Sequence, residues 1–207
     1  MDPDAVELRV LGCLLEKQRT TPDAYPLSLN ALRLACNQAT NRDPVVEYDE
    51  ATIRAALERL SRRGWTRLAS GPGSRAAKYR HMLDDALRLA DEELALLCVL
   101  VLRGPQTPGE LKGRTERLHR FGSLQEIEES LSRLIERDLV VVLTRRPGQK
   151  EERYEQLLGG PSAPTVETGS VHVGPGPAEP DRLAALEHEV RELRADLAAL
   201  RARLDAP

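Results

Sequence analysis

The chain contains an internal duplication, which limits its possible folds more than any other feature of the sequence. Residues 7–22 align without a gap on residues 93–108, an offset of 86, and residues 56–65 align on residues 130–139, an offset of 74. Because both copies repeat the same order of segments, we expect the two halves to share one fold. The offsets differ by 12 residues, so the first copy has an insertion, for which the polar connector 37–44 is the candidate.

The first copy is predicted to form three helices and a β-hairpin. Apolar residues recur at steps of three and four, the period of an amphipathic helix, in segments that cover residues 4–17, 28–36 and 49–63. Gly64 is a suitable left-handed cap for the third helix. Strand-like segments at residues 65–70 and 75–82 then flank the turn-forming residues 71–74.

The second copy repeats this order. Helical spacing predicts three helices, over residues 91–103, from about Pro108, and over residues 123–138. Strands at residues 139–143 and 151–157 flank a basic turn that contains Pro147 and Gly148. Three helices followed by a two-stranded wing are typical of the winged helix-turn-helix domain.

The predicted fold class is therefore mainly α with small β-hairpins (α+β), with two tandem winged helix-turn-helix domains plus a C-terminal coiled-coil helix. The parts are winged-helix domain 1 (1–84), winged-helix domain 2 (85–158), a flexible Gly/Pro linker (159–180) and a short coiled-coil helix (181–207). The linker is assigned because ten of its 22 residues are Gly or Pro.

A heptad pattern near the C-terminus predicts a homo-oligomer. Seven apolar residues alternate at steps of three and four from Leu183 to Leu204. In a parallel pair, opposite charges such as Glu189 and Arg194 would meet across the seam, whereas an antiparallel pair would oppose like charges. A parallel dimer is therefore favoured. A single surface helix folded back on the body is the alternative.

Positive charge is concentrated in the first copy. Residues 49–82 hold eight Lys or Arg against three acids, a balance of +5, although the whole chain has a net charge of −3. Such a surface suits the phosphate backbone of double-stranded DNA, so we predict a DNA-binding protein and transcriptional regulator. The candidate DNA-binding residues are Arg54, Arg59, Arg62, Arg63, Arg67, Arg75, Lys78 and Arg80.

The second copy is not expected to share this partner. Residues 124–157 hold six Lys or Arg and eight acids, a balance of −2. Acids at the start of its third helix would face the DNA phosphates, and like charges repel each other. We expect this copy to contact a protein partner or another subunit. A protein-interaction scaffold without a nucleic-acid role is the alternative function for the chain, because a fold alone does not fix a function.

The connector at residues 37–44 has two interpretations. Asn and Asp side chains bond to nearby backbone and Pro fixes the backbone angle, so the connector is expected to be an ordered loop that caps itself. The other interpretation places Asn41 and Arg42 on the DNA-contact surface beside the third helix.

The sequence contains no catalytic, metal-binding or cofactor-binding motif that we recognise. Cys13, Cys36 and Cys98 are isolated and lie in helical patterns, so they are predicted to be buried apolar side chains. The longest apolar stretch, residues 94–102, is too short for a membrane span, and the N-terminus lacks the features of a secretion signal. We expect a cytoplasmic protein that is not an enzyme.

Several segments resemble the bacterial YceH family, whose members have no known function. The segments that carry the resemblance are residues 8–32, 35–44, 96–111 and 145–158. Together they span residues 8–158. The resemblance implies two tandem winged-helix domains, which agrees with the duplication, and it implies no catalytic residue, ligand or operator.

Overall fold

The computed structural model describes residues 2–70, 76–145 and 151–160. The chain divides into two compact units, Met1–Ala163 and Pro164–Pro207, and all the described residues belong to the first. The predicted coiled-coil helix, nearly all of the predicted linker and the tip of the first hairpin, which includes Arg75, lie outside the described residues.

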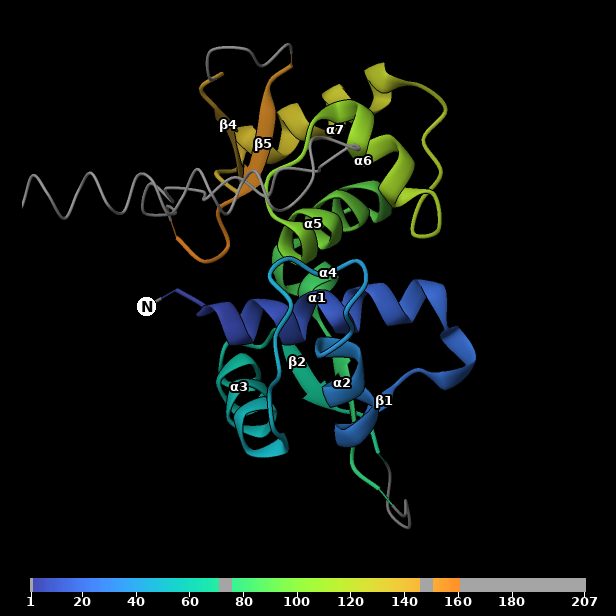
Figure 1. Ribbon diagram of the computed structural model, residues 1–207, viewed down its shortest axis with the longest axis vertical. Coiled ribbons are helices and arrows are strands. Elements are labelled where there is room, and N and C mark those ends of the chain that lie inside the picture. The colour runs from blue at the N-terminus through green and yellow to red at the C-terminus, as the bar shows by residue number, and fades with distance from the viewer. Residues whose placement is uncertain (1, 71–75, 146–150, 161–207) are drawn as a thin grey trace, which may run out of the picture. The chain divides into compact units, whose positions relative to one another are not determined.

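The first half consists of three main helices and a small antiparallel sheet (Figure 1). In chain order its elements are α1 (Ala5–Thr20), the 3-10 turn η1 (Pro22–Ala24), β1 (Leu27–Ser28), α2 (Leu29–Cys36), α3 (Glu50–Arg62), β2 (Thr66–Leu68), β3 (Lys78–His81) and α4 (Leu83–Leu87). The strand order is β1-β3-β2. The three helices and the hairpin confirm the sequence-based prediction, which did not include η1, β1 or α4.

The second half repeats the order of three helices and a hairpin. Its elements are α5 (Asp91–Arg103), α6 (Pro108–Thr115), α7 (Leu124–Glu136), β4 (Val140–Leu143) and β5 (Arg153–Gln156). The predicted mainly helical α+β class is thereby confirmed. Within the described part of the chain, no helix combines the length and apolar content needed to cross a membrane.

The insertion in the first half is divided between two places. The second helices, α2 and α6, begin at Leu29 and Pro108, an offset of 79. The offset therefore falls by seven residues between the first and second helices and by five between the second and third. The prediction that the 37–44 connector accounts for the insertion is therefore right for only five of the 12 inserted residues. The other seven lie in the segment of η1 and β1.

Side-chain caps fix where most helices begin. A helix leaves its first backbone N–H groups without partners, and a short polar side chain just before the helix can accept from one of them. The residues that do so here are Asp4 for α1, Ser28 for α2, Asp49 for α3, Thr107 for α6 and Ser123 for α7. These caps explain why the predicted helix boundaries are close to the observed ones.

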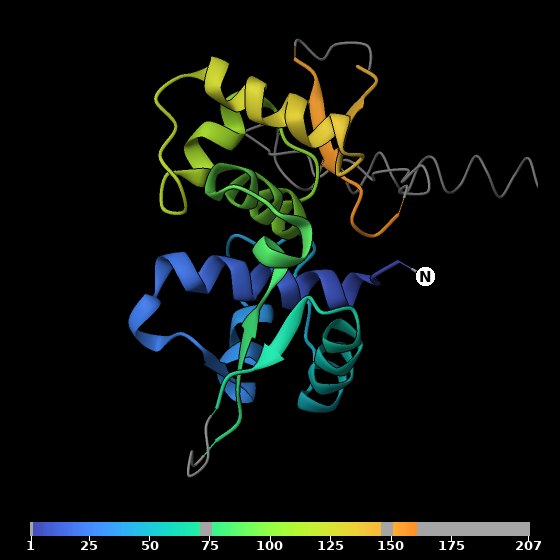
Figure 2. The ribbon, with the colours of Figure 1, turned by 180° about the vertical axis from the view of Figure 1, so that it is seen from behind.

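The core is continuous through both halves because α1 packs directly on α5 (Figures 1 and 2). At the crossing, the Cys98 thiol donates to the Gly12 carbonyl at 3.5 Å. A Cβ atom on Gly12 would lie 2.8 Å from the side chain of Leu102 and 2.9 Å from that of Val101. The two helices can therefore approach this closely only because residue 12 has no side chain.

The three cysteines are buried and form no disulfide, as the sequence predicts. Burial raises the pKa of the Cys98 thiol well above its usual value. Because the thiolate is the reactive form, Cys98 behaves as a small apolar side chain.

His81 joins the base of the β2–β3 hairpin to α1. The ring is fully buried, its Nε2 atom bonds to Gln18 of α1, and its Nδ1 atom accepts from the backbone N–H of Leu83 at 3.3 Å. Nδ1 is therefore unprotonated and the ring is neutral. Burial lowers the pKa of His81 to about 4, although Asp84 lies 3.6 Å away.

We predict that Gly12→Ala destabilises the protein. Overpacking against Leu102 and Val101 costs about 1–3 kcal/mol, whereas replacing a helical glycine by alanine contributes about 0.5–1 kcal/mol. The free energy of unfolding should fall by about 1–2 kcal/mol in urea denaturation. Gly113→Ala in α6 is the matched control, because no atom lies within 4 Å of its added Cβ. That variant should be as stable as the original protein or more stable, and equal effects of both changes would contradict the close crossing.

We also predict a pH dependence from His81. Between about pH 6.5 and 4 the unfolded chain binds a proton on this ring and the folded chain does not, so stability falls as the pH is lowered through this window. The loss should be about 3 kcal/mol and should level off below pH 4. His81→Gln, which does not titrate, should remove this part of the slope in denaturation curves measured at each pH. An unchanged slope would show that other groups cause it.

Candidate nucleic-acid interface

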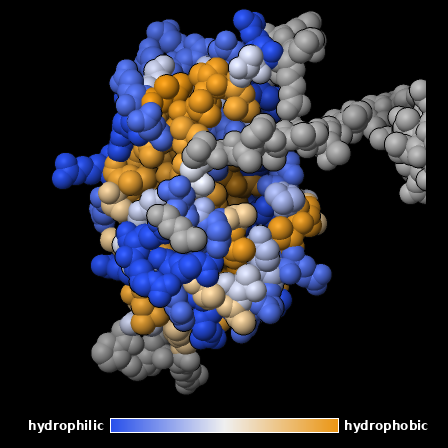
Figure 3. Space-filling model, turned by 90° about the vertical axis from the view of Figure 1, so that its left-hand side faces the viewer, coloured by the Kyte–Doolittle hydropathy of each residue, from blue (hydrophilic) through white to orange (hydrophobic). Residues whose placement is uncertain are grey.

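Helix α3 buries one face and presents the other to solvent. Ile53, Leu57 and Leu60 pack into the core, in agreement with their predicted helical spacing. Arg54, Glu58 and Arg62 are exposed on the other side. Hydrophilic side chains cover much of the face of the molecule that carries α3 (Figure 3). The outer surface of α3 is therefore polar and accessible.

A groove of about 410 Å³ lies between α3 and the β2–β3 hairpin. Arg54 and Arg62 line it from α3, Arg67 and Leu68 from β2, and Tyr79 from β3. Leu68 is 57% exposed despite being apolar. Three arginines and the largely exposed Leu68 thus border one groove.

The arginines of this groove have no partner among the residues that the structure describes. Arg54, Arg62 and Arg67 are exposed, and none of them forms a hydrogen bond or ion pair with a residue of the described ranges. An anion can therefore bind them without breaking an existing ion pair. Guanidinium groups suit phosphate particularly well, since two parallel N–H groups can donate to two oxygens.

The outer face of the hairpin is also basic. Arg67 pairs directly with Arg80 in the β2–β3 register, so both side chains project from the same face of the sheet. Lys78, two residues before Arg80, shares that face and is exposed. Like charges placed directly opposite each other are unfavourable in a sheet, and a bound polyanion would relieve the repulsion.

The structure places Arg59 and Arg63 outside the groove. Both turn toward the N-terminal end of α1, where Glu7 lies 3.2 Å from Arg59 Nε and 3.5 Å from Arg63 Nε. Arg59 Nη2 also donates to Asp4 at 2.7 Å, and Arg63 stacks over the ring of Trp65 at 5.9 Å. These two candidates hold α3 against α1. A helical wheel of α3 alone could not show that Glu7 of α1 lies beside them.

The same arrangement occurs in the second half. Glu93 of α5 lies 3.5 Å from Arg133 of α7 and 3.5 Å from Arg137, the residue that follows α7. Glu93 lies 86 residues after Glu7, and Arg133 and Arg137 lie 74 residues after Arg59 and Arg63, so they are equivalent in the duplication. We call each set a glutamate clamp. In both halves the clamping carboxylate is nearly buried, 3% and 6% exposed, so the clamp is a shared structural feature of the duplicated fold.

The groove arginines, by contrast, are specific to the first half. The positions in the second half that correspond to Arg54 and Arg62 are Glu128 and Glu136, and the one that corresponds to Arg67 is Val141. Positive charge at the groove is therefore not needed for the fold, because the second half forms the same elements without it.

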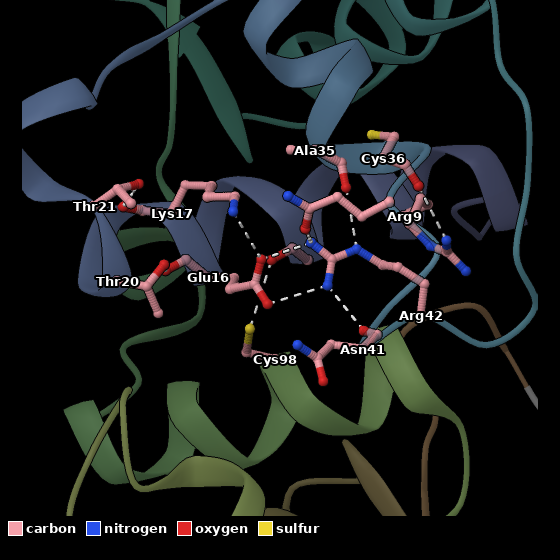
Figure 4. Close-up of polar contacts among 12 residues, drawn as sticks. Arg9, Glu16, Lys17, Thr20, Thr21, Ala35, Cys36, Asn41, Arg42 and Cys98 are labelled. Atoms are coloured by element: carbon pink, nitrogen blue, oxygen red, sulfur yellow. Dashed lines mark hydrogen bonds and ion pairs between the residues drawn. The ribbon is translucent and has the colours of Figure 1, made fainter.

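The connector between α2 and α3 is an ordered loop, as one of its two interpretations predicts (Figure 4). The side chain of Asn37 bonds in both directions with the backbone of Tyr48, at 2.8 and 2.9 Å. Arg42 is buried and bonds to Glu16 of α1 at 2.6 and 3.1 Å. The interpretation that places Arg42 on the DNA-contact surface is therefore wrong, whereas Asn41 is exposed and accepts from Arg103.

In the described ranges, no three His, Cys, Asp or Glu residues are grouped so that they could hold a metal ion. Several buried polar residues instead form ion pairs or hydrogen bonds within the protein, as in the clamps and around Arg42. The groove between α3 and the hairpin is thus distinguished by its exposed, positively charged arginines rather than by catalytic or metal-binding side chains.

Comparisons with known proteins identify relatives over most of the chain. The model of the family DUF480, described as a protein of unknown function, matches residues 4–149. The chain is 49% identical to a UPF0502 protein of Solibacter usitatus over 92% of both chains. It is 50% identical to one of Koribacter versatilis, over 89% of this chain and 87% of the relative, and 46% identical to one of Pectobacterium atrosepticum, over 95% and 97%. These names state no activity or ligand.

We predict that Glu7→Gln destabilises the first half by loosening its glutamate clamp. Removing one partner of a fully buried ion pair costs about 3–5 kcal/mol, but Arg59 and Arg63 are partly exposed and can be hydrated, so a loss of about 1–3 kcal/mol is expected in chemical denaturation. Glu116→Gln is the control, because Glu116 pairs with Arg120 on the surface. The control should change stability by less than about 0.5 kcal/mol. Similar losses in both variants would contradict the role of the clamp.

Proposed function

Since the chain belongs to the DUF480 family of proteins of unknown function, we propose a function from its geometry: it binds double-stranded DNA through the groove between α3 and the β2–β3 hairpin. We further propose that each half is a winged-helix domain, with α3 as the recognition helix and the β2–β3 hairpin as the wing. The chain would then act as a transcriptional regulator.

One observation carries this proposal. Arg54, Arg62 and Arg67 line a single accessible groove without a protein partner in the described ranges. Exposed arginines are often only solvated, but these three come from two elements and border the same groove. The opposed pair of Arg67 and Arg80 extends the positive charge over the hairpin. A DNA backbone offers the repeated phosphates that such a surface needs.

The spacing of the groove arginines suits a duplex. Arg54 and Arg62 are eight residues apart, which is about 12 Å along a helix axis. The major groove of B-DNA is about 12 Å wide and admits an α-helix. We therefore assign Arg54 and Arg62 to base edges and nearby phosphates. Arg67, Lys78 and Arg80 are assigned to phosphates beside the wing.

Two acids on α3 oppose simple attraction to phosphate. Glu50 and Glu58 are exposed, and Glu58 also lines the groove. A carboxylate that reaches a base edge can accept from the N4 amino group of cytosine. Glu58 is therefore expected to restrict the base sequence that binds. This differs from the second half, where acids replace the groove arginines themselves.

The second half is better suited to a protein partner. Leu124 at the start of α7 and Val142 of β4 are large apolar side chains, 45% and 38% exposed. Acids occupy the α7 positions that correspond to the groove arginines. An interaction scaffold is therefore the second candidate function, and in that case this half would carry it.

The test is a fluorescence-anisotropy titration of the full chain with a labelled random duplex at several salt concentrations. We expect binding that weakens steeply with salt. Arg67→Gln should reduce the slope of log K against log salt by about one unit, because it removes a phosphate contact. Arg62→Gln should weaken binding about 10-fold if it contacts a base bidentately. Arg120→Gln, on the surface of the second half, should leave both quantities unchanged.

Arg59→Gln separates the groove from the glutamate clamp. It should lower the stability of the protein and leave the salt slope unchanged, since Arg59 is held by Glu7 and Asp4. Absence of salt-dependent duplex binding by the original protein would refute the proposal. Co-purification of a protein that the second half retains would then favour the scaffold.

A further inference from the structure

A second cavity lies where the two halves meet. It has a volume of about 210 Å³ and is enclosed by α1, the connector, α5 and the region of α6. It contacts none of the residues that line the α3 groove. A volume of this size admits a small molecule but not a nucleic acid.

Three arginines face this cavity: Arg103 from the end of α5, Arg114 from α6 and Arg117 just beyond it. Arg103 donates to the side chain of Asn41, which is a neutral acceptor. Arg114 has one distant ion pair, 3.5 Å from Glu110 on its own helix. Arg117 is exposed and forms no hydrogen bond or ion pair with a residue in the described ranges. The positive charge is therefore only partly compensated.

The arginines also repel one another. Burial lowers the pKa of Arg103, and the charge of Arg114 lowers it further. Both effects disfavour the charged form of the Arg103 guanidinium. An anion placed between these side chains would offset both effects, because its negative charge stabilises the charged guanidinium.

Glu16, the one acid among the residues that line the cavity, offsets only part of the effect on Arg103, whose pKa stays lowered (Figure 4). Its two carboxylate oxygens accept from Arg42 at 2.6 and 3.1 Å, and Lys17 lies 3.7 Å away. The side chain of Arg42 is completely buried, 0% exposed, and cannot move toward the cavity without losing these bonds. The carboxylate of Glu16 is thus paired with Arg42 rather than with an arginine of the cavity.

Part of the remaining wall is apolar, and Thr20 and Asn41 are its polar members. Val99, Leu102 and Leu118 line the cavity beside the arginines. The nearby thiol of Cys98 donates to the carbonyl of Gly12, so it adds no free polar group. The lining therefore combines positive charge with apolar surface, as sites for small ligands commonly do.

We propose that this cavity binds a small metabolite with an oxyanion head, a phosphate or a carboxylate, and a short apolar body. Arg103, Arg114 and Arg117 hold the head, because their planar N–H groups match two oxygens of either anion. Val99, Leu102 and Leu118 contact the body. The site is independent of the α3 groove, so its existence does not rest on duplex binding.

Isothermal titration calorimetry of the full chain tests this site. Inorganic phosphate and succinate serve as the two probes, and sodium chloride at matched ionic strength provides the baseline. We expect a dissociation constant of about 1 mM or lower for at least one probe. Comparison of the two probes shows whether the cavity prefers a phosphate or a carboxylate.

Arginine variants locate the binding. Arg117→Gln and Arg114→Gln should each weaken the binding of the preferred probe about 5- to 10-fold, the loss of one charge-assisted contact. Arg120→Gln is the matched control, since Arg120 is three residues from Arg117 but pairs with Glu116 outside the cavity. Because Arg117 is exposed, its replacement should not impair folding.

Two outcomes would overturn the proposal. The first is that neither probe binds the original protein beyond the chloride baseline at concentrations up to about 10 mM. The second is that Arg117→Gln and Arg114→Gln bind the preferred probe as tightly as Arg120→Gln does. Selective loss in the two cavity variants supports it. Duplex binding can succeed or fail in the separate anisotropy titration without altering either result.

Discussion

The close crossing of α1 and α5 at Gly12 is the contact on which the rest of the structure depends. A side chain at residue 12 would collide with Leu102 and Val101, so hydrogen there allows the two halves to share one core. The crossing also brings the connector and α5 together, which forms the cavity beside Glu16. It leaves α3 and the β2–β3 hairpin on the far side of α1 from α5, where they remain accessible (Figure 1).

The two glutamate clamps show how charge is used differently for structure and for recognition. Glu7 and Glu93 are nearly buried, and each fastens a third helix to a first helix through two arginines. These arginines are present in both halves, as a structural role requires. Arg54 and Arg62 occur only in the first half. The duplication thus provides an internal comparison, in which shared charges support the fold and unshared charges are candidates for binding.

Much of the fold could be predicted from the sequence, because helical spacing and a left-handed cap such as Gly64 are local signals. The assignment of α3 and of the hairpins follows directly from them. The partners of Arg59 and Arg63 could not be predicted, since a helical wheel shows which way a residue points but not which acid a distant segment brings to it. The burial of Arg42 could not be predicted either, because a polar connector is ordinarily a surface loop. The 210 Å³ cavity depends on how the halves meet, about which local patterns carry no information.

Gly12 and Cys98 occupy equivalent positions of the duplication, and they contact each other. Contact between equivalent residues is what a two-fold axis produces in a symmetric dimer. In a dimer of identical subunits every substitution appears twice, so a basic groove on one subunit is always matched by the same groove on the other. Joining both copies in one polypeptide removes that restriction. One copy can then become acidic while its neighbour stays basic, and a chain with pseudo-symmetric packing can present two unlike surfaces.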